Sequence, residues 1–418
     1  MTPCTIVLVT MGALAGGVDD PTGSTLCSGA AEGPCFAGLG DLPGGGQGSQ
    51  ALGIAASGSA VVGQSQSQTS GEAFRWTVAG MEGLGFVANG SNSRAIASSA
   101  DGNIIVGAGT DQLGFVQAFR WTSHDGMQAL PTLDGGAESS AVAVNGGGTI
   151  AVGWSTYIDG STEAQVWREK ETTGLGDLPG GLMTSRAAAL SDDGSVVVGW
   201  GNSGVTEAFR WTEDEGMVGI GFLPGAILNG SQAFGVSQDG THVVGMSWSP
   251  TGIEAFHWSA AGGMAGLGDL PGGSALDFSF AFDVSADGRV IVGLGQDDDG
   301  GAAVIWMDGV IHRLQDVLED EYGLVLPGWH LAEAKAVSAD GRTIVGIGYH
   351  DDLPEGWIVR LPGPCTIDLD GDGLIDTTDL NIVLANWGES GGIADLNASG
   401  LVDAADLTII LANWGECP

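Results

Sequence analysis

Residues 186–219 read RAAALSDDGSVVVGWGNSGVTEAFRWTEDEGMVG, and this order of elements recurs along most of the chain. The consensus copy has a small-residue run, a turn of the Ser-x-Asp-Gly type, a Val-Gly run, an Ala-Phe-Arg-Trp run and a Gly-Met run, and individual copies depart from it. The glycine that closes the Val-Gly run stands at positions 63, 107, 153, 199, 245, 293 and 346, in steps of 44, 46, 46, 46, 48 and 53 residues. Such a period is typical of repeat architectures.

Each repeat predicts four short strands separated by turn residues, for example 93–98, 104–107, 117–121 and 126–130. Four strands in about 46 residues make one propeller blade. The seven repeats therefore predict an all-β fold, a seven-bladed β-propeller, over residues 36–361. An open β-solenoid is the alternative. The Asp-Gly pairs at 101, 193, 239, 287 and 340 lie between the first two strands, so type I′ turns are predicted there.

The ends of the repeat array are out of phase. The last copy stops after its third strand at Arg360, whereas residues 36–40 form a lone fourth-strand element ahead of the first complete copy. We expect this N-terminal strand to complete the last blade, because that pairing closes the ring and leaves no free sheet edge.

Two repeated elements carry a family resemblance. The octapeptide GLGDLPGG (174–181 and 266–273) and the run AFRW (73–76 and 208–211) resemble the extracellular HAF-repeat family over residues 36–361. The resemblance implies secretion and a β-repeat architecture, but it implies no particular reaction.

The composition limits the partners. A net charge of −39, with 12 Lys and Arg against 51 Asp and Glu, repels nucleic acid and anionic lipid and favours Ca2+. No apolar run is long enough to span a bilayer. Residues 1–17 are predicted to be a signal peptide, although they lack the usual basic region, and an N-terminal segment (18–35) follows. The protein is therefore expected to be extracellular.

The cysteines agree with export. Without Cys4, which lies in the predicted signal peptide, two local pairs remain, and we expect disulfides between Cys27 and Cys35 and between Cys365 and Cys417. Free thiols in a reducing compartment are the alternative.

Residues 362–418 contain two copies of a calcium-loop pattern, DLDGDGLIDTTD (368–379) and DLNASGLVDAAD (395–406). Oxygen ligands at positions 1, 3, 5, 7, 9 and 12 with glycine at 6 are what an EF-hand-like loop needs. The predicted ligands are Asp368, Asp370, Asp372, Leu374, Asp376 and Asp379 in the first loop and Asp395, Asn397, Ser399, Leu401, Asp403 and Asp406 in the second. Because the first loop has five carboxylates and the second has three, the first is expected to bind Ca2+ more tightly.

Each loop runs into a predicted amphipathic helix. The apolar stripes, expected to form a small core, are Leu380, Val383, Leu384 and Trp387, and Leu407, Ile410, Leu411 and Trp414. The duplicated loop and helix resemble the type I dockerin over residues 365–417. That resemblance implies a cohesin-like partner, which would contact Thr377 and Thr378 in one copy and Ala404 and Ala405 in the other. A calcium-stabilised terminal module without a cohesin is the alternative.

Four aromatic residues just past the Val-Gly runs suggest a ligand platform. Trp154, Trp200, Trp248 and Tyr349 belong to four repeats and are expected at one face of the ring, in the loops between strands two and three. Aromatic faces there would suit stacking against sugar rings. Packing between blades is the alternative.

Catalytic residues are not predicted. The aspartates of the Asp-Leu-Pro motif (41, 177 and 269) recur from repeat to repeat, the run 297–299 fits a solvated loop, and the histidines lack zinc-ligand spacing. The sequence therefore favours a secreted, non-enzymatic binding or scaffold protein that recognises extracellular glycan and carries a calcium-dependent dockerin-like module. The alternative is a glycan-degrading hydrolase or lyase, which would need two unique carboxylates about 5–9.5 Å apart at the propeller mouth.

Overall fold

The structure is a computed structural model. It describes residues 27, 33–168, 171–226, 228–271, 278–297, 300–307, 309–362, 367, 369–370, 374–397 and 399–416.

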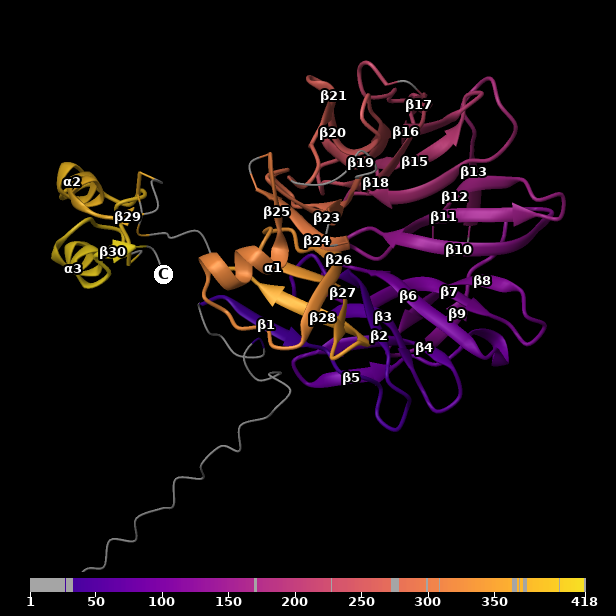
Figure 1. The fold of residues 1–418 in the computed structure, drawn as a ribbon, viewed down its shortest axis with the longest axis horizontal. Coiled ribbons are helices and arrows are strands. Elements are labelled where there is room, and N and C mark those ends of the chain that lie inside the picture. The colour runs from indigo at the N-terminus through magenta and orange to yellow at the C-terminus, as the bar shows by residue number, and fades with distance from the viewer. Residues whose placement is uncertain are drawn as a thin grey trace, which may run out of the picture.

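The repeats form seven four-stranded antiparallel sheets, arranged in chain order around a ring (Figure 1). The first four blades are β2 (Ser49–Ile54), β3 (Val61–Gln66), β4 (Gly71–Thr77) and β5 (Gly80–Gly83); β6 (Asn92–Ser98), β7 (Ile104–Thr110), β8 (Val116–Thr122) and β9 (Gly126–Ala129); β10 (Gly136–Val144), β11 (Ile150–Tyr157), β12 (Thr162–Arg168) and β13 (Glu171–Gly176); and β14 (Arg186–Leu190), β15 (Val196–Asn202), β16 (Thr206–Thr212) and β17 (Gly216–Gly219).

The remaining blades complete the circle, and a short 3-10 turn, η1 (Val87–Asn89), joins the first two. They are β18 (Ser231–Val236), β19 (His242–Trp248), β20 (Ile253–Ser259) and β21 (Gly263–Gly266); β22 (Ser279–Val284), β23 (Val290–Asp297), β24 (Gly300–Met307) and β25 (Val310–Arg313); and β26 (Trp329–Val337), β27 (Thr343–His350), β28 (Leu353–Arg360) and β1 (Cys35–Gly38). The prediction of a seven-bladed propeller is confirmed.

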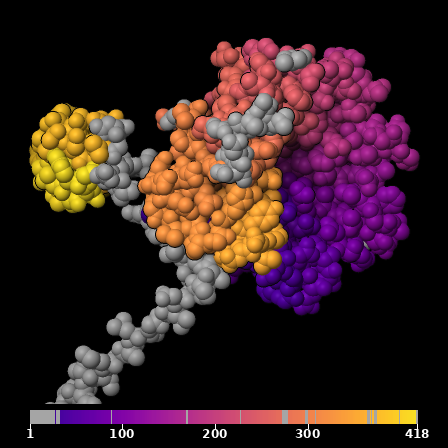
Figure 2. Space-filling view, viewed as in Figure 1, coloured from indigo at the N-terminus to yellow at the C-terminus, as the bar shows by residue number. Residues whose placement is uncertain are grey.

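The ring is closed by its N-terminal strand. β1 pairs antiparallel with β28, from Cys35 opposite Arg360 to Gly38 opposite Trp357. The first and last blades, indigo and orange, lie in contact in the space-filling view (Figure 2). The predicted pairing of the two chain ends is confirmed.

The glycine that marks the period is required by packing. In every blade its Cα lies so close to the innermost strand that an added Cβ would overlap a backbone carbonyl oxygen of that strand; for Gly107 this is the carbonyl oxygen of Arg94. The phenylalanine of the Ala-Phe-Arg-Trp run fills the remaining space: the Phe119 ring would lie 2.9 Å from a Cβ on Gly107. A side chain cannot be accommodated there without moving the backbone.

Replacing Gly107 with alanine is therefore expected to lower the free energy of unfolding by about 1–3 kcal/mol, the usual cost of overpacking. Gly147→Ala is the matched control, because the nearest atom to its added Cβ lies 3.9 Å away. Chemical denaturation of both variants would measure the difference. Equal denaturation midpoints for the two variants would show that the backbone at Gly107 can move to accommodate a Cβ at no cost in stability.

The Asp-Gly turns differ from the prediction. Glycines such as Gly102 have positive φ, 70° in this case, but none of the five preceding aspartates does, so the turns are not type I′. Instead the Asp101 carboxylate accepts hydrogen bonds from the Ser99 hydroxyl at 2.6 Å and from the backbone N–H of Asn103 at 3.0 Å. These bonds hold the turn together. The prediction that these aspartates form turns holds, with a different turn geometry.

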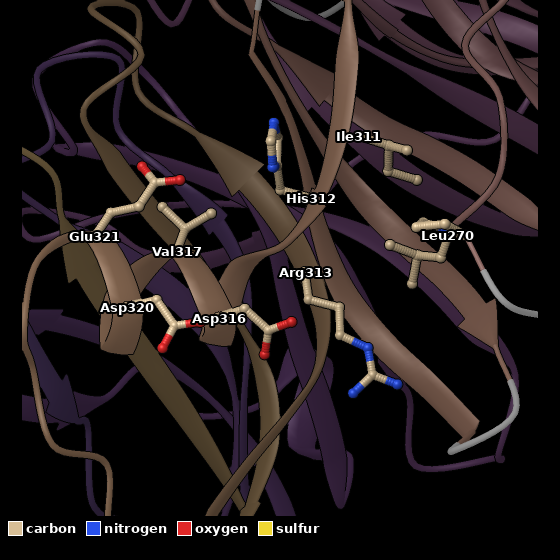
Figure 3. A pocket seen from close by; sticks show the side chains of 9 residues that line it. Leu270, Ile311, His312, Arg313, Asp316, Val317, Asp320 and Glu321 are labelled. Atoms are coloured by element: carbon tan, nitrogen blue, oxygen red, sulfur yellow. The ribbon is translucent and has the colours of Figure 1, made fainter.

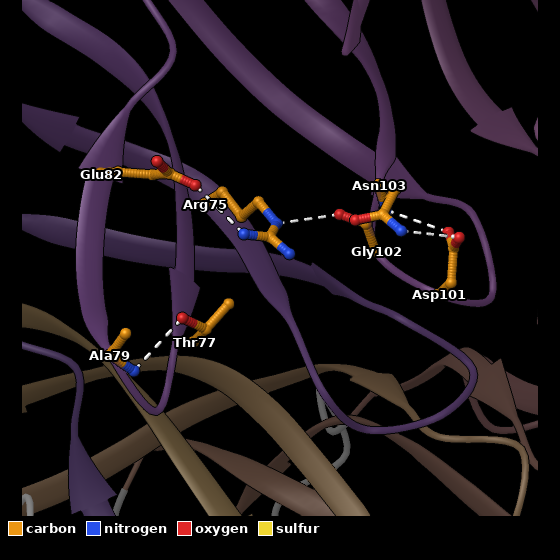
Figure 4. A network of polar contacts seen from close by, with 7 residues as sticks. All are labelled: Arg75, Thr77, Ala79, Glu82, Asp101, Gly102 and Asn103. Carbon is orange, nitrogen blue, oxygen red and sulfur yellow. Dashed lines mark hydrogen bonds and ion pairs between the residues drawn. The ribbon is translucent and has the colours of Figure 1, made fainter. Parts of the chain in front are cut away.

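The turn at Asp101 and Gly102 also contacts the preceding blade. Arg75, from the Ala-Phe-Arg-Trp run of the first blade, donates from Nε to the Gly102 carbonyl of the second at 2.9 Å and pairs with Glu82 at 3.1 Å (Figure 4). Arg75 therefore links the first blade to the second.

The 53-residue step between the last two period glycines contains a helical insertion. A short helix α1 (Leu314–Asp316) continues into the π-helical turn η2 (Val317–Glu321), between β25 and β26. Leu314, Val317 and Leu318 are buried in the core of the last two blades. Sequence periodicity did not reveal this insertion, because it spans only about two helical turns.

The C-terminal residues form a separate small core. Helices α2 (Thr377–Ala385) and α3 (Ala404–Ala412) pack together, and the short strands β29 (Leu374–Ile375) and β30 (Gly415–Glu416) pair. The core consists of Ile375, Val383, Ala394, Val402 and Ile410. The structure departs from the predicted stripe, because Leu384, Trp387, Leu411 and Trp414 are about half exposed.

Candidate functional site

A β-bulge in the innermost strand of every blade shapes the centre of the propeller. The strand register skips one residue, and a bulge of this kind re-aims the side chain of the unpaired residue. The skipped residues, here called the bulge ring, are Leu52, Ile96, Val142, Ala188, Phe234, Phe282 and Lys335. All seven line one cavity of about 350 Å³, which therefore lies on the axis of the propeller.

A second ring lies two residues earlier in the same strands, closer to the mouth of the channel. Each of its members is paired with the residue that follows a period glycine. This mouth ring consists of Gln50, Arg94, Ser140, Arg186, Gln232, Phe280 and Glu333. Because neighbouring strands are antiparallel, this mouth lies at the face that carries the loops between strands two and three.

Aromatic side chains follow one side of the cavity. The ring of Trp200 meets Phe234 edge-on at 6.1 Å between centroids, and Phe234 lies 5.9 Å from Phe282. Phe280 continues the cluster 6.3 Å from Phe282. These partly exposed rings make the wall of the cavity apolar over blades four to six.

Cations border the aromatic wall at both ends. The Arg186 guanidinium carbon lies 5.0 Å from the centre of the Trp154 ring, and the Lys335 ammonium lies 4.1 Å from the centre of Phe282. Lys335 also forms an ion pair with Glu333. The combination of apolar faces and fixed charges is that of a small-molecule site.

Asp283 is the single carboxylate among the residues that line this cavity. The other six blades have glycine or alanine at its position. Desolvation raises the pKa of Asp283 to about 6, although the backbone N–H groups of Val337 and Val284, each at 2.9 Å, act in the opposite direction. Asp283 also lines a smaller cavity of about 150 Å³ at the other end of the channel.

The four aromatic residues singled out in the sequence separate into two groups. Trp154 and Trp200 both line the axial cavity and lie within strands, since β11 and β15 extend beyond the predicted loop positions. Trp248 is the last residue of β19 and donates its backbone N–H to Gly230, and Tyr349 is 45% exposed beside His330. The latter two do not line the axial cavity.

Sequence reasoning missed Phe234, Phe282, Lys335 and Arg186. A signal was present: in each repeat an alanine precedes the bulge-ring residue, which itself varies from leucine to lysine. A position that varies in this way is not fixed by packing within the repeat, so its side chain can differ from blade to blade and contact a ligand.

A second cavity, of about 340 Å³, lies beside the helical insertion. Figure 3 shows Asp316, Asp320 and Glu321 on the helical segment, across from His312 and Arg313 of β25. The apolar side chains of Ile311 and Leu270 lie on the far side of β25 from the helical segment in this view. The acidic wall suits a cation, but within the described chain no three His, Cys, Asp or Glu side chains are gathered as a metal site.

The second calcium-type loop has an ordered framework. The Asp395 carboxylate accepts N–H bonds from Ser399 at 3.0 Å and Gly400 at 2.8 Å, and the Asn397 amide oxygen accepts from Ser399 at 2.9 Å. These side chains therefore converge on one turn. Their hard oxygen atoms are the donor set that Ca2+ prefers, so the residues fit the ion.

The last ligand position closes each loop in the same way. Asp406 is fully buried and accepts N–H bonds from Asp403 at 2.8 Å and Asn397 at 3.1 Å, which hold its pKa below the ordinary value. Burial acts to raise the pKa of Asp379, but N–H bonds from Asp376 and Leu369 outweigh it. Both carboxylates are thus held in the charged form that a cation needs.

Some predicted features lie outside the described residues. They are Asp368, Asp372, Cys365, Cys417, Asp298 and Asp299, together with the predicted signal peptide. The other cysteine pair, Cys27 and Cys35, forms a disulfide as predicted. None of the described helices is long and apolar enough to cross a membrane.

No protein-family model and no curated protein sequence matches the chain. Several solved structures are similar to the chain. The oligogalacturonate lyase from Vibrio parahaemolyticus aligns with a TM-score of 0.52 at 12% identity, over 78% of this chain and 93% of that one. The likeness is one of fold.

Two further structures align more loosely. TolB from Acinetobacter baumannii gives a TM-score of 0.44 at 12% identity, over 61% of this chain and 63% of that one. The β-propeller domain of the trilobed protease from Pyrococcus furiosus gives 0.44 at 11% identity, over 62% and 82%. Similarity at this level carries no functional information.

Proposed function

We propose that the protein is an extracellular, non-enzymatic glycan-binding propeller of the HAF-repeat type, attached to a partner through a calcium-dependent, dockerin-like module. The axial cavity carries the proposal. Its mouth combines two partly exposed indoles, Trp154 and Trp200, with the rings of Phe234 and Phe282. Apolar sugar faces pack on such rings, while the adjacent charged groups fix orientation.

Export is supported by the disulfide between Cys27 and Cys35, because disulfides persist in oxidising compartments. The extreme acidity agrees with a soluble exported protein. Both observations accord with the secretion that the HAF-repeat resemblance implies.

The attachment role rests on the exposed apolar side chains of the terminal module. Leu384 and Trp387 of the first copy and Leu411 and Trp414 of the second are about half exposed, at equivalent positions of the two copies. Exposed apolar patches on a small domain are typical of interaction surfaces. A cohesin-like protein is the partner that fits the dockerin resemblance.

Binding of an oligosaccharide panel to the full chain, followed by calorimetry, tests the glycan role. Trp200→Ala is expected to weaken binding at least tenfold, because it removes one face of the cavity. Trp248→Ala is the matched control, since this tryptophan does not line the axial cavity. Equal effects of both substitutions, or no binding of any oligosaccharide, would contradict the proposed role.

A glycan-degrading activity is the second candidate, and Asp283 is the observation that favours it. A carboxyl group with a pKa of about 6 inside a ligand cavity is suited to proton transfer. Product analysis after long incubation with the bound glycan would decide between the two. Cleavage that is lost in Asp283→Asn would favour the enzyme.

A further inference from the structure

Cations are scarce in this protein, and their placement is informative. Of 12 Lys and Arg residues, three lie on the innermost strands: Arg94, Arg186 and Lys335. Several others are held by carboxylates, as in Arg75 with Glu82, Arg168 with Glu213, and Arg210 with Glu215. Lys335 is likewise paired with Glu333.

Arg94 and Arg186 differ from these. Neither has a carboxylate partner among the described residues, although the chain contains 51 Asp and Glu. A guanidinium that has no anionic partner within so acidic a protein can bind an anionic group of a ligand. Arginine suits that role, because its planar fork of donors matches a carboxylate bidentately.

Both arginines belong to the mouth ring. They lie at the same level of blades two and four, on either side of Ser140 and its strand partner Trp154 in blade three. The Arg186 guanidinium is held over the Trp154 ring. Arg94 is exposed, and partial desolvation by the surrounding protein lowers the pKa of its guanidinium.

We propose that the channel mouth binds an acidic glycan, a sugar chain with carboxylate groups, with Arg94 and Arg186 binding the carboxylates and the neighbouring aromatic rings packing on the sugar. The inference rests on the proposed glycan-binding function and names its ligand class. A carboxylate gains charge-assisted, bidentate hydrogen bonds from these guanidinium groups, which a neutral sugar cannot form.

The overall negative charge does not prevent this binding. At physiological ionic strength charges are screened over about 8 Å, so the carboxylates distributed over the outer surface act weakly at the mouth. Glu333, the one carboxylate of the mouth ring, is paired with Lys335, whereas Arg94 and Arg186 have no carboxylate partner among the described residues. A continuous phosphate backbone, by contrast, would have to lie along the acidic surface around the mouth, which disfavours nucleic acid.

The test compares a galacturonic acid tetramer with its methyl ester, using calorimetry on the full chain. Esterification removes the charge and keeps the sugar rings, so we expect the ester to bind at least tenfold more weakly. Binding of the acid is also expected to weaken between 50 and 200 mM salt. Glucuronic and mannuronic acid tetramers, each with its ester, extend the same comparison to other uronates.

Substitutions localise the effect. Arg186→Gln and Arg94→Gln are each expected to weaken binding of the acid about tenfold or more and to leave binding of the ester unchanged. Arg120→Gln is the control, since it makes the same charge change in a separate cavity between blades two and three. Thermal unfolding verifies that all three variants fold.

The outcomes separate the two proposals. Equal affinity for the acids and their esters, or acid binding that survives both mouth substitutions, would overturn the acidic ligand and leave glycan binding intact. Binding of neutral oligosaccharides but of no acidic one would also overturn the acidic ligand and leave glycan binding intact. Failure of every sugar to bind would overturn the glycan function itself, and the acidic ligand with it.

Discussion

Deletion of residues 1–46 is expected to open the ring and produce an aggregating protein that unfolds at a lower temperature. The deletion removes β1, and with it the buried side chains of Ala37, Leu39 and Leu42. Each buried leucine contributes about 1.5–3 kcal/mol. The backbone of β28 would also lose its outer partner, leaving an unpaired edge that can recruit other chains.

Light scattering and thermal unfolding of the shortened protein measure both effects. Deletion of residues 1–26 is the matched control, because it retains Cys27 and the whole of β1. A point variant, Ala37→Asp, places a charge at a buried position of the same strand and should mimic the long deletion. A monomeric protein with an unchanged melting temperature after the long deletion would show that β1 does not close the propeller.

Chelation of Ca2+ is expected to unfold the C-terminal module while the propeller stays folded. The module core contains only five buried apolar residues among its described residues, too little apolar surface to offset the chain entropy of about fifty residues. Ionised oxygen ligands crowded into two short loops repel one another until a cation neutralises them. Metal binding should therefore be coupled to folding.

Scanning calorimetry of the full chain should show two transitions with Ca2+ and the loss of one after chelation. The two sites are expected to be unequal, so Asp372→Ala should cost more affinity than Ser399→Ala. Asn386→Ala, which alters the end of α2 away from the proposed ligands, serves as the control. A module that melts identically with and without Ca2+ would contradict the calcium proposal.

The number and order of blades could be predicted from sequence because they depend on local, repeated signals. Each period glycine faces the inner strand of its own blade, so the packing requirement repeats with the sequence, as at Gly107 and Gly199. Ring closure was also predictable, since the strand missing from the last repeat had one unpaired candidate at the other end of the chain.

The turn geometry was less predictable. An Asp-Gly pair is compatible with several turns, and the turn found at Asp101 is one in which its carboxylate accepts a hydrogen bond from the Ser99 hydroxyl and its φ is not positive. Similarly, an apolar stripe predicts a buried face only where another element covers it. Trp387 and Trp414 lie beyond the small core that two nine-residue helices can form.

The sequence by itself determined the repeat and the closed ring of seven blades, because neighbouring residues and fixed spacing specify them. Calcium binding by the two terminal loops stays a prediction. The composition of the channel mouth was decided only by the tertiary structure. Trp154, Phe282 and Lys335 come from different blades, far apart in the chain, and converge because a bulge turns one side chain of every innermost strand toward a common axis. That convergence depends on ring closure, which no single repeat contains.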